Sequence, residues 1–536
     1  MRSLDIHAAT HDPTLIEALD VLLAHEHSRG EYLTGPAPLD FVSDLWRRAV
    51  LVTKDKDGDV RLARRPFELC VLSYVAAELK NGDLYVQGSE EYADYRAQLL
   101  PWAECEPLVA DYCAARGVAP TAHGFVADLK TWLASVAAEV DRTYPDNGQV
   151  VIGQDGEPVL KRLVRKEPPE GTARVEAALL ERMPERNLLD VLCNVEHWTG
   201  WTRHFGPPSG SDPKLDRAKE RYILATFGYA TNMGPAQLAR HTRGLVTPHM
   251  ISFVNHQHVT VAKLDAAARD IVRAYGRFDL PSLWGTGKVA AADGTKFSLY
   301  EDNLVSEFSL RYGDYGGIAY HHVADTYVAL LSHFITCGSW EAIYILDLLY
   351  KNLSEVTPDT LHADTQGQNA PVFALAYLLG VQLQPRIRNW GDLIFYRPRK
   401  DTRYQHIDPL FRDTIDWDLL ETHWPDLLQV ALSIQAGKML PSTILRKLGT
   451  DSRKSRLYQA FRELGRVVRT VFLLEYISNL PLREQIQAST NKAEAYNGFS
   501  KWLFFGGDGI IAENDPEEQR NKRSASSTTG CWPGPW

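Results

Sequence analysis

Alternating apolar and polar positions mark two hairpins within the first 170 residues. The segments LVTKDKDGDVRLARR (51–65) and VVIGQDGEPVLKRLV (150–164) each place an Asp-Gly pair between two alternating runs. An Asp-Gly pair in that position is a strong signal of a tight turn between antiparallel strands. The rest of this stretch favours helices, and the Pro- and Gly-rich KEPPEGT ends it. We therefore expect residues 1–170 to form a mixed, mainly helical region with small β-ribbons.

From residue 171 to 286 the apolar residues recur at intervals of three and four. Segments such as ARVEAALLERM, AKERYILATFGYA and VAKLDAAARDIVRAYGRF show this spacing. The spacing is typical of amphipathic helices with one buried face. No fixed repeat period joins the segments, so the pattern predicts a helical domain rather than a solenoid.

After residue 287 strand-like and helix-like segments alternate. GKVAAADGTKFSLY, SEFSLRYG and YVALLSHFITC predict three strands, and SWEAIYILDLLYKNL predicts a helix. Ser339 is the expected cap of that helix, with Ile343, Leu346 and Leu349 facing inward. TLHAD then predicts a fourth strand, NAPVFALAYLLG a helix that ends at Gly380, and LQPRIRNW a fifth strand.

This order of elements predicts an α/β plus α protein with a ribonuclease H-like core at residues 287–512. A mostly helical insertion at about 400–485 interrupts the core, and a last helix is expected to start near Asn491. Ala493, Tyr496, Phe499 and Leu503 form the buried stripe expected for this helix. Residues 513–536 show no periodic pattern and form an aberrant tail.

Composition adds limits to this picture. The chain has 536 residues, 44% of them hydrophobic and 24% charged. That composition is typical of globular proteins, and the length exceeds the roughly 250–300 residues that one core supports. Six scattered cysteines without a CxxC pair indicate neither zinc nor disulfides. No apolar run reaches the length of a membrane span, so we expect a cytoplasmic protein without a membrane partner.

Positive charge is local although the formal net charge is −10. Residues 441–480 carry eight basic against three acidic residues, and residues 381–410 carry six against three. Such runs are commonly solvated helix faces. Because both runs lie between two of the acidic residues considered next, we also expect them to serve phosphate binding.

Three acidic residues stand in strongly structured contexts: Asp293 in VAAADGTKFSLY, Asp364 in TLHADTQGQ and Glu494 in STNKAEAYNGFSKWLFF. Taken singly, they are also consistent with a hairpin turn, a helix cap and a capping box with Asn491. Taken together and in this order, they predict a DDE site, because three carboxylates can hold two divalent cations about 3.5–4 Å apart around a phosphodiester.

Basic and aromatic residues near these acids are candidate DNA contacts. Arg386 and Arg388 precede Trp390, and Arg397 follows shortly. Such interleaved side chains can clamp phosphates and stack on a displaced base. The alternative for Trp390 is a lid over the edge of the core, and the pattern favours the two equally. Lys492, two residues before Glu494, completes the set of expected DNA contacts.

His321, His322 and His333 form a second cluster of candidate ligands. Adjacent residues of a strand point to opposite faces, and no Glu stands at HExxH spacing. We therefore interpret these histidines as hydrogen-bonded structural residues rather than metal ligands.

Long segments of the chain resemble the transposases of the Tn-three family of replicative bacterial transposons. They include GYATNMGPAQLARHTRG, AAADGTKFS, LHADTQGQNAPVFALAYLLG and STNKAEAYNGFSKWLFFG, and the resemblance extends to about residue 515. It implies that Asp293, Asp364 and Glu494 are the catalytic triad, with two Mg²⁺ ions, or Mn²⁺, as cofactors. The implied partners are the inverted-repeat transposon ends, target DNA and a second copy of the chain, and the implied location is the bacterial nucleoid.

The resemblance also implies a reaction and two departures. Nicking at the transposon ends would free a 3′ hydroxyl that attacks target DNA without second-strand cleavage. Family members are longer, so we expect this chain to be a fragment without the domains that read the ends, and the tail to reflect a frameshift. The alternatives are a ribonuclease H-like nuclease without strand transfer, and a non-catalytic remnant that binds DNA or interferes with an intact transposase.

Overall fold

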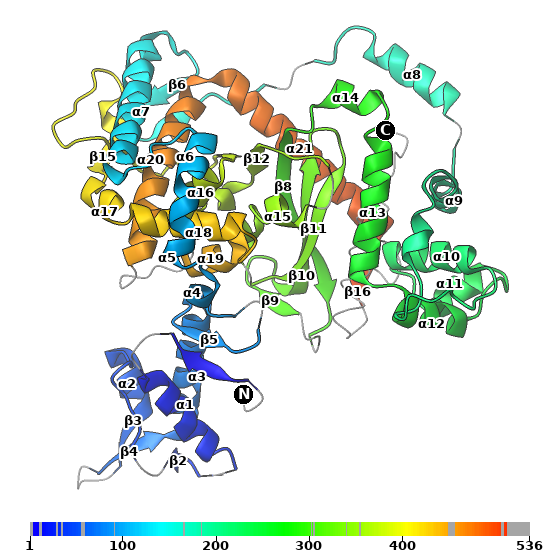
Figure 1. Ribbon diagram of the computed structural model, residues 1–536, viewed down its shortest axis with the longest axis horizontal. Helices are drawn as coiled ribbons and strands as arrows, with labels where there is room; N and C mark the ends of the chain where they lie inside the picture. The colour runs from blue at the N-terminus through cyan, green and yellow to red at the C-terminus, as the bar shows by residue number, and fades with distance from the viewer. Residues whose placement is uncertain are drawn as a thin grey trace. The chain divides into compact units, whose positions relative to one another are not determined.

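The computed structural model of the protein describes residues 4–511, except 10–12, 28–29, 34–35, 55–58, 90–91, 165–166, 184, 302, 304–305, 339, 353–354, 449–455 and 505–508 (Figure 1). The chain divides into two compact units. The first joins Met1–Asp128 to Asp416–Gly465, and the second joins Leu129–Ile415 to Arg466–Trp536. The boundaries expected at residues 170 and 286 both fall inside the second unit and stay predictions.

The first unit is mainly helical, with two small sheets. In one sheet β4 lies between β2 and β3, and in the other β1 pairs with β5. Its elements are β1 Ile6–Ala8, α1 Thr14–Ala24, β2 Tyr32–Leu33, α2 Asp44–Val50, β3 Leu51–Lys54, β4 Asp59–Ala63, α3 Arg64–Asn81, β5 Leu84–Val86, α4 Tyr95–Gln98, α5 Trp102–Cys105, η1 Glu106–Leu108, α6 Val109–Arg116, the start of α7 Ala122–Thr143, α17 Trp417–Thr422, α18 Trp424–Gln435, α19 Pro441–Leu448 and the start of α20 Arg456–Ser478.

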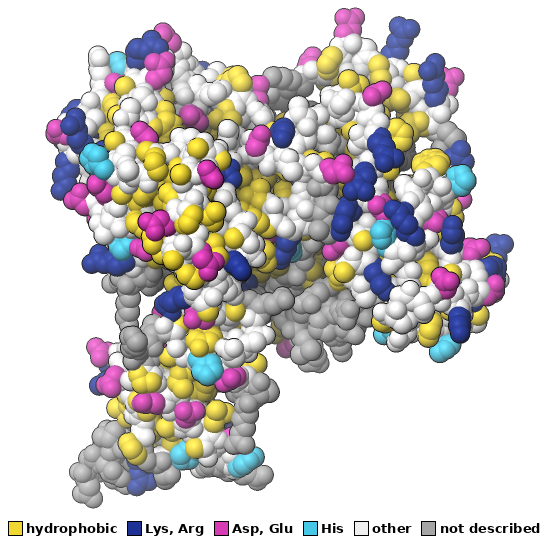
Figure 2. All heavy atoms as spheres, viewed as in Figure 1, with side chains coloured by type: hydrophobic (Ala, Val, Ile, Leu, Met, Phe, Trp, Pro, Cys, Tyr) yellow, Lys and Arg dark blue, Asp and Glu magenta, His cyan; other side chains and the backbone are white. Residues whose placement is uncertain are grey.

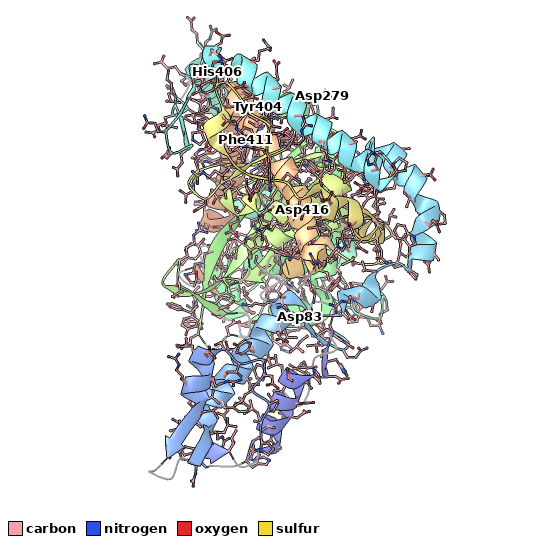
Figure 3. The ribbon with its side chains drawn as sticks, turned by 90° about the vertical axis from the view of Figure 1, so that its left-hand side faces the viewer. Asp83, Asp279, Tyr404, His406, Phe411 and Asp416 are labelled. Atoms are coloured by element: carbon pink, nitrogen blue, oxygen red, sulfur yellow. The ribbon has the colours of Figure 1, made fainter. Side chains whose placement is uncertain are left out.

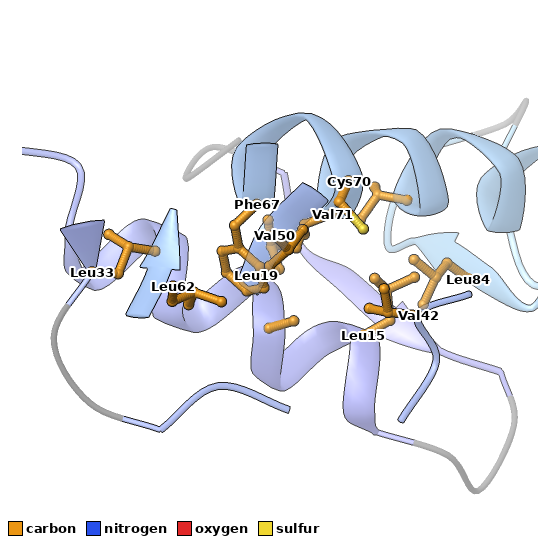
Figure 4. Packing of buried hydrophobic residues seen from close by; sticks show 12 residues of the cluster. Leu15, Leu19, Leu33, Val42, Val50, Leu62, Phe67, Cys70, Val71 and Leu84 are labelled. Carbon is orange, nitrogen blue, oxygen red and sulfur yellow. The ribbon is translucent and has the colours of Figure 1, made fainter. Parts of the chain in front are cut away.

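Apolar side chains of α1 and α3 form the core at the N-terminal end of this unit. Leu15 and Leu19 of α1 lie in one buried cluster with Phe67 and Val71 of α3 (Figure 4). Both pairs are spaced four residues apart, which places each pair on one helix face. Helix α3 ends at Gly82, whose positive φ of 79° suits a residue without a side chain.

Helices dominate the start of the second unit, as the three- and four-residue spacing predicted. Two antiparallel strands precede them, and these confirm the second predicted hairpin, as the pairing of β3 with β4 confirms the first. The elements are the end of α7, η2 Tyr144–Asp146, β6 Val150–Ile152, β7 Pro158–Leu160, α8 Thr172–Arg182, α9 Leu188–Thr199, η3 Trp201–His204, α10 Ala218–Ala230, α11 Pro235–His241, α12 Pro248–His258, α13 Val261–Tyr275 and α14 Leu280–Trp284.

A mixed seven-stranded sheet forms the centre of the second unit (Figure 1). The path β11-β10-β8-β12-β13 is antiparallel from β11 to β8 and parallel from β8 to β13, and β16 pairs with β8 while β9 pairs with β10. Its strands are β8 Val289–Leu299, β9 Glu307–Ser309, β10 Asp314–Ala324, β11 Ala329–Thr336, β12 Thr360–Ala363, β13 Gln382–Pro385 and β16 Ile510–Ile511. The strands predicted at TLHAD and LQPRIRNW are confirmed as β12 and β13.

The remaining elements of the second unit include the helices that cover this sheet. Helix α21 contacts β8, β10 and β12, and α16 contacts β13. Helix α16 ends at Gly380 with a φ of 74°, as predicted. The elements are η4 Glu341–Tyr344, α15 Leu348–Lys351, η5 Thr365–Gln368, α16 Ala370–Leu379, β14 Phe395–Arg397, η6 Asp408–Leu410, β15 Phe411–Thr414, the end of α20 and α21 Leu480–Leu503.

The long strand β10 was missed by the sequence pattern. The strand predicted at SEFSLRYG is only the short β9, and the main partner of β8 is DYGGIAYHHVA. Gly316 and Gly317 argued against a strand at this position, because glycine is depleted in strands. Close packing requires both glycines: a Cβ would lie 2.5 Å from the Phe297 oxygen at Gly316 and 2.3 Å from the Phe334 ring at Gly317.

Three further predictions need correction. The helix predicted over SWEAIYILDLLYKNL is two short pieces, η4 and α15, although Ile343 and Leu346 are buried as expected; the expected cap Ser339 lies outside the described residues. The predicted insertion also contains β15, and β14 lies just before it. The last helix does not begin near Asn491: α21 starts at Leu480, where the Asn479 side chain accepts a hydrogen bond from Leu482 N.

No helix among the described residues combines the length and apolarity needed to cross a membrane.

We expect Phe67→Ala to lower the free energy of unfolding of the first unit by about 3–5 kcal/mol, because it leaves a cavity among packed side chains. Phe67 is fully buried, whereas Leu69 on the same helix is 64% exposed. Leu69→Ala is therefore the matched control and should change stability by less than about 0.5 kcal/mol. Urea unfolding followed by circular dichroism measures both values, and equal effects of the two substitutions would contradict this packing.

Candidate active site

Asp293 and Asp364 lie side by side because their strands are parallel neighbours. The register pairs Ala292 of β8 with Ala363 of β12, so Asp293 is the next residue of β8 and Asp364 is the residue that follows β12. Ligands commonly bind near the carboxyl ends of such strands. Asp293 is not in a hairpin turn, the alternative left open by its Asp-Gly pair, because β8 continues through it to Leu299.

Burial and mutual repulsion make this carboxylate pair hard to ionise. Burial, and then the negative charges of Asp364 and Glu494, raise the pKa of Asp293 to about 6, although a hydrogen bond from Asn497 opposes the rise. Burial also raises the pKa of Asp364, against the hydrogen bond from Gln366 N to its Oδ1 at 3.0 Å. A bound cation would relieve both the desolvation and the repulsion.

Glu494 reaches the same region from α21. One helical turn further on, Asn497 Nδ2 donates to Asp293 Oδ2 at 2.9 Å, which anchors this part of α21 over β8. The Glu494 side chain is 52% exposed, and its Oε1 lies 3.5 Å from Arg386 Nη1. The capping-box alternative is excluded, because Asn491 lies inside α21. The structure thus brings the three predicted acids to one region of the sheet.

A fourth acid, Glu341, was not predicted from the sequence. Its Oε1 accepts a hydrogen bond from Gln366 Nε2 at 3.0 Å, and its backbone N donates to Gln366 Oε1 at 3.2 Å. Burial, followed by the charges of Asp364 and Asp293, raises the pKa of Glu341 to about 7. Gly294 leaves room for this carboxylate, because a Cβ there would lie 2.1 Å from Glu341 Oε2.

This donor set suits hard divalent cations. Carboxylate oxygens are the ligands that Mg²⁺ prefers, and Mg²⁺ commonly uses only a few of them. Within the described residues, no three acidic, His or Cys side chains already stand at the spacing of a metal site. The Glu494 carboxylate instead forms an ion pair with Arg386. Asp293, Asp364 and Glu494 are the residues that would hold such cations.

Arg386, Arg388 and Trp390, three of the predicted DNA contacts, line a common cleft of about 750 Å³. Trp390 also packs in parallel on Phe395, with ring centroids 6.4 Å apart, and at a tilt on Tyr476, 6.0 Å away. The indole is half-buried, so it both covers the core edge and faces the cleft. The two interpretations of Trp390 are therefore compatible.

Arg397 does not join this cleft. Its guanidinium binds the Asp408 carboxylate, with Nη2 to Oδ2 at 3.2 Å, and also donates to the Phe411 carbonyl at 3.1 Å. It lies over the Phe411 ring, on which Tyr404 stacks with ring centroids 4.8 Å apart. Only 12% of the Arg397 side chain is exposed, so its charge is used in a structural ion pair.

Lys492 is likewise engaged within the protein. Its Nζ donates to the carbonyls of Asp325 at 2.7 Å and Trp284 at 3.3 Å, and lies 4.5 Å from the centre of the Tyr327 ring. These contacts fasten α21 to α14 and to the turn between β10 and β11. Burial lowers the pKa of Lys492. The structure therefore gives this lysine a positioning contact, and the DNA contact expected of it stays a prediction.

The three histidines are structural, as interpreted from their spacing. His321 packs edge-on against Tyr496 of α21, while His322 Nε2 donates to the Ile345 carbonyl at 3.0 Å. Burial lowers the pKa of His322 to about 4, so it is neutral near pH 7. His333 packs on Tyr344. Neighbours along β10 thus point to opposite faces.

Comparison with known proteins agrees with this geometry. The chain is 28% identical to the "Transposase for transposon Tn21" of Escherichia coli over 97% of its own length and 52% of the relative. It is 27% identical to the "Transposase for transposon Tn1546" of Enterococcus faecium and 26% identical to the "Transposase for transposon gamma-delta" of Escherichia coli (strain K12), in each case over 98% of this chain and 52% of the relative. The chain thus spans about half the length of the curated relatives it matches.

The family assignment rests on the second half of the chain together with the helices before the sheet. Residues 190–527, more than half of the sequence, match the family described as "Tn3 transposase DDE domain". This range contains all three predicted acids and every strand of the central sheet. The chain therefore belongs to the Tn3 transposase DDE domain family.

Proposed function

We propose that this protein cleaves DNA strands at transposon ends and joins them to target DNA, with Asp293, Asp364 and Glu494 holding two Mg²⁺ ions, which Mn²⁺ can replace. The observation that carries the proposal is the convergence of these three acids in a chain of a DDE transposase family. We further infer a ribonuclease H-like core, transposon ends and target DNA as partners, and a homodimer as the working state.

The metal pair, when bound, supplies activation of the attacking oxygen and stabilisation of the leaving oxygen. The protein's own residues hold the carboxylates in place. Asp293 and Asp364 are held by hydrogen bonds from Asn497 Nδ2 and Gln366 N, so both carboxylates are oriented before DNA arrives. Such preorganisation avoids reorganisation during the reaction, which is a large part of catalysis in polar sites.

Arg386 lies between the acidic residues and the cleft in which we expect DNA to bind. Its guanidinium lies 3.5 Å from Glu494 Oε1 and lines the cleft with Arg388. If Glu494 held a cation, the Arg386 charge would be available to a phosphate oxygen. Burial raises the pKa of Asp364, and the charges of Arg311 and Arg388 oppose that rise, so positive charge lies close to this acid. This field favours an approaching phosphodiester.

We expect Asp293→Asn, Asp364→Asn and Glu494→Gln each to lower the rate of strand joining at least about a hundredfold, because each removes a charge that balances the cations. The assay incubates pre-cut transposon ends with supercoiled target DNA and Mg²⁺ and measures joined products on gels. Asp279→Asn is the matched control, since Asp279 is exposed at the start of α14 and belongs to neither β8 nor β12 (Figure 3).

Three results would contradict the proposal in different ways. Nicked DNA without joined products would indicate a ribonuclease H-like nuclease. DNA binding without either product would indicate a non-catalytic protein. Full activity of Asp293→Asn would exclude these acids as the metal site.

We expect the affinity for Mn²⁺ to fall steeply as the pH decreases below about 6. The folded-state pKa of Asp293 is raised to about 6 from 3.8, so a proton competes with the cation below that pH. The same sign means that ionisation of Asp293 costs stability: without metal, the folded state should gain stability as the pH falls from about 6 toward 4.

Titration of Mn²⁺ by electron paramagnetic resonance at pH 5.0–8.0 measures this dependence without DNA. One displaced proton gives about a tenfold loss of affinity per pH unit below the pKa. Asp293→Asn should bind Mn²⁺ weakly at every pH. An affinity of the unaltered protein that is independent of pH would contradict the metal assignment of Asp293.

A further inference from the structure

The cleft beside Glu494 is strongly basic and is built from four segments of the chain. One begins at the end of β7, one follows β13, one is the end of α20 at Tyr476, and the fourth is the N-terminal half of α21. Among its described lining residues none is acidic, while five are basic: Lys161, Arg162, Arg386, Arg388 and Arg483. Lining charge of one sign in a concave surface concentrates ligands of the opposite charge. The cleft therefore selects an anion.

Arg483 gives the cleft a built anion site. Only 3% of this residue is exposed, and its Nε and Nη2 atoms have no hydrogen-bond partner within the described structure. Burial raises the pKa of Tyr476, which lines the same cleft, so its hydroxyl is neutral near pH 7. The charge of Glu484 acts on Arg483, but neither Nε nor Nη2 donates a hydrogen bond to a described residue. A buried guanidinium with unpaired donors is costly, because it loses hydration without gaining hydrogen bonds in return. Its fork of N–H donors matches two oxygens of a phosphate.

The position of Arg483 relates this site to the carboxylates. Arg483 and Glu494 are eleven residues apart on α21, which is roughly three helical turns and about 16 Å. They therefore lie on nearly the same helix face. Gln487 and Asn491 line the cleft between them, and Arg386 both lines the cleft and lies 3.5 Å from Glu494. The cleft thus runs along α21 from Arg483 to the acidic residues.

We propose that this cleft binds the sugar-phosphate backbone of a single DNA strand, and that Arg483 holds a phosphate a few nucleotides away from the one that reacts. The assignment rests on the proposed function, because the strand must lead to the carboxylates. A single strand suits the cleft better than a duplex, since the half-buried Trp390 lines it and offers an aromatic face to an unstacked base.

The test measures binding of a fluorescein-labelled 20-nucleotide single strand by fluorescence anisotropy, in EDTA, at several salt concentrations from 50 to 200 mM. We expect Arg483→Gln to weaken binding about tenfold and to lower the slope of log affinity against log salt by about 0.7, the value for one phosphate contact. Arg483→Lys should restore part of the affinity. Arg240→Gln is the control, because Arg240 is exposed on α11 outside the cleft.

A second variant guards against misfolding of the buried site. Lys161 and Arg162 are exposed on the rim, so the double substitution Lys161→Gln, Arg162→Gln leaves the core untouched. It should lower the salt slope by about 1.4. A blunt duplex of the same sequence should respond less than the single strand to Arg483→Gln. Equal losses for both would overturn the choice of a single strand.

The outcomes separate this inference from the proposed function. If the unaltered protein joins DNA ends while Arg483→Gln and the double variant bind the single strand as it does, the inference fails and the function stands. If the protein joins no ends but Arg483→Gln still weakens binding with the reduced salt slope, the inference stands and the function fails. No binding of the single strand by the unaltered protein would overturn the inference directly.

Discussion

The pairing of β8 with β12 is the constraint on which the site depends. Parallel register brings Asp293 and Asp364 next to each other in a half-buried place, where each makes ionisation of the other harder. Hydrogen bonds and nearby positive charge oppose that repulsion. Asn497 and Gln366 donate hydrogen bonds, and Arg311 and Arg388 supply positive charge. A divalent cation, as proposed for this site, would relieve the cost of placing these acids together.

Much of this site could be predicted from the sequence, because its parts have local signatures. Asp364 ends a short apolar strand before a polar turn, and Gly380 ends the following helix, so TLHAD and NAPVFALAYLLG identified β12 and α16. Glu341 and Asn497 could not be found in this way. Their roles come from contacts with Gly294 and Asp293, which are distant in sequence. Only the folded sheet makes those residues neighbours.

Two errors share one physical cause, since tertiary contacts overruled the local preference of the sequence. Gly316 and Gly317 argue against a strand, yet close approach of β8 and β11 requires them. Asn491 has the type and spacing of a helix cap but lies within a longer helix that begins at Leu480. The DNA contact expected of Arg397 stays a prediction, and the structure adds an ion pair of its guanidinium with Asp408. Residue type alone could not distinguish these cases.

The overall charge of −10 conceals how basic residues are distributed. Figure 2 shows Lys and Arg side chains mixed with Asp and Glu over the visible surface. The cleft along α21 differs, because its lining within the described residues carries only one sign. Because Arg483 and Glu494 both lie on α21, the helix fixes the distance between them. Substitutions along it leave the spacing intact, whereas a one-residue insertion would rotate one end by about 100° relative to the other. The spacing of the two sites therefore depends more on the number of residues between Arg483 and Glu494 than on which residues they are.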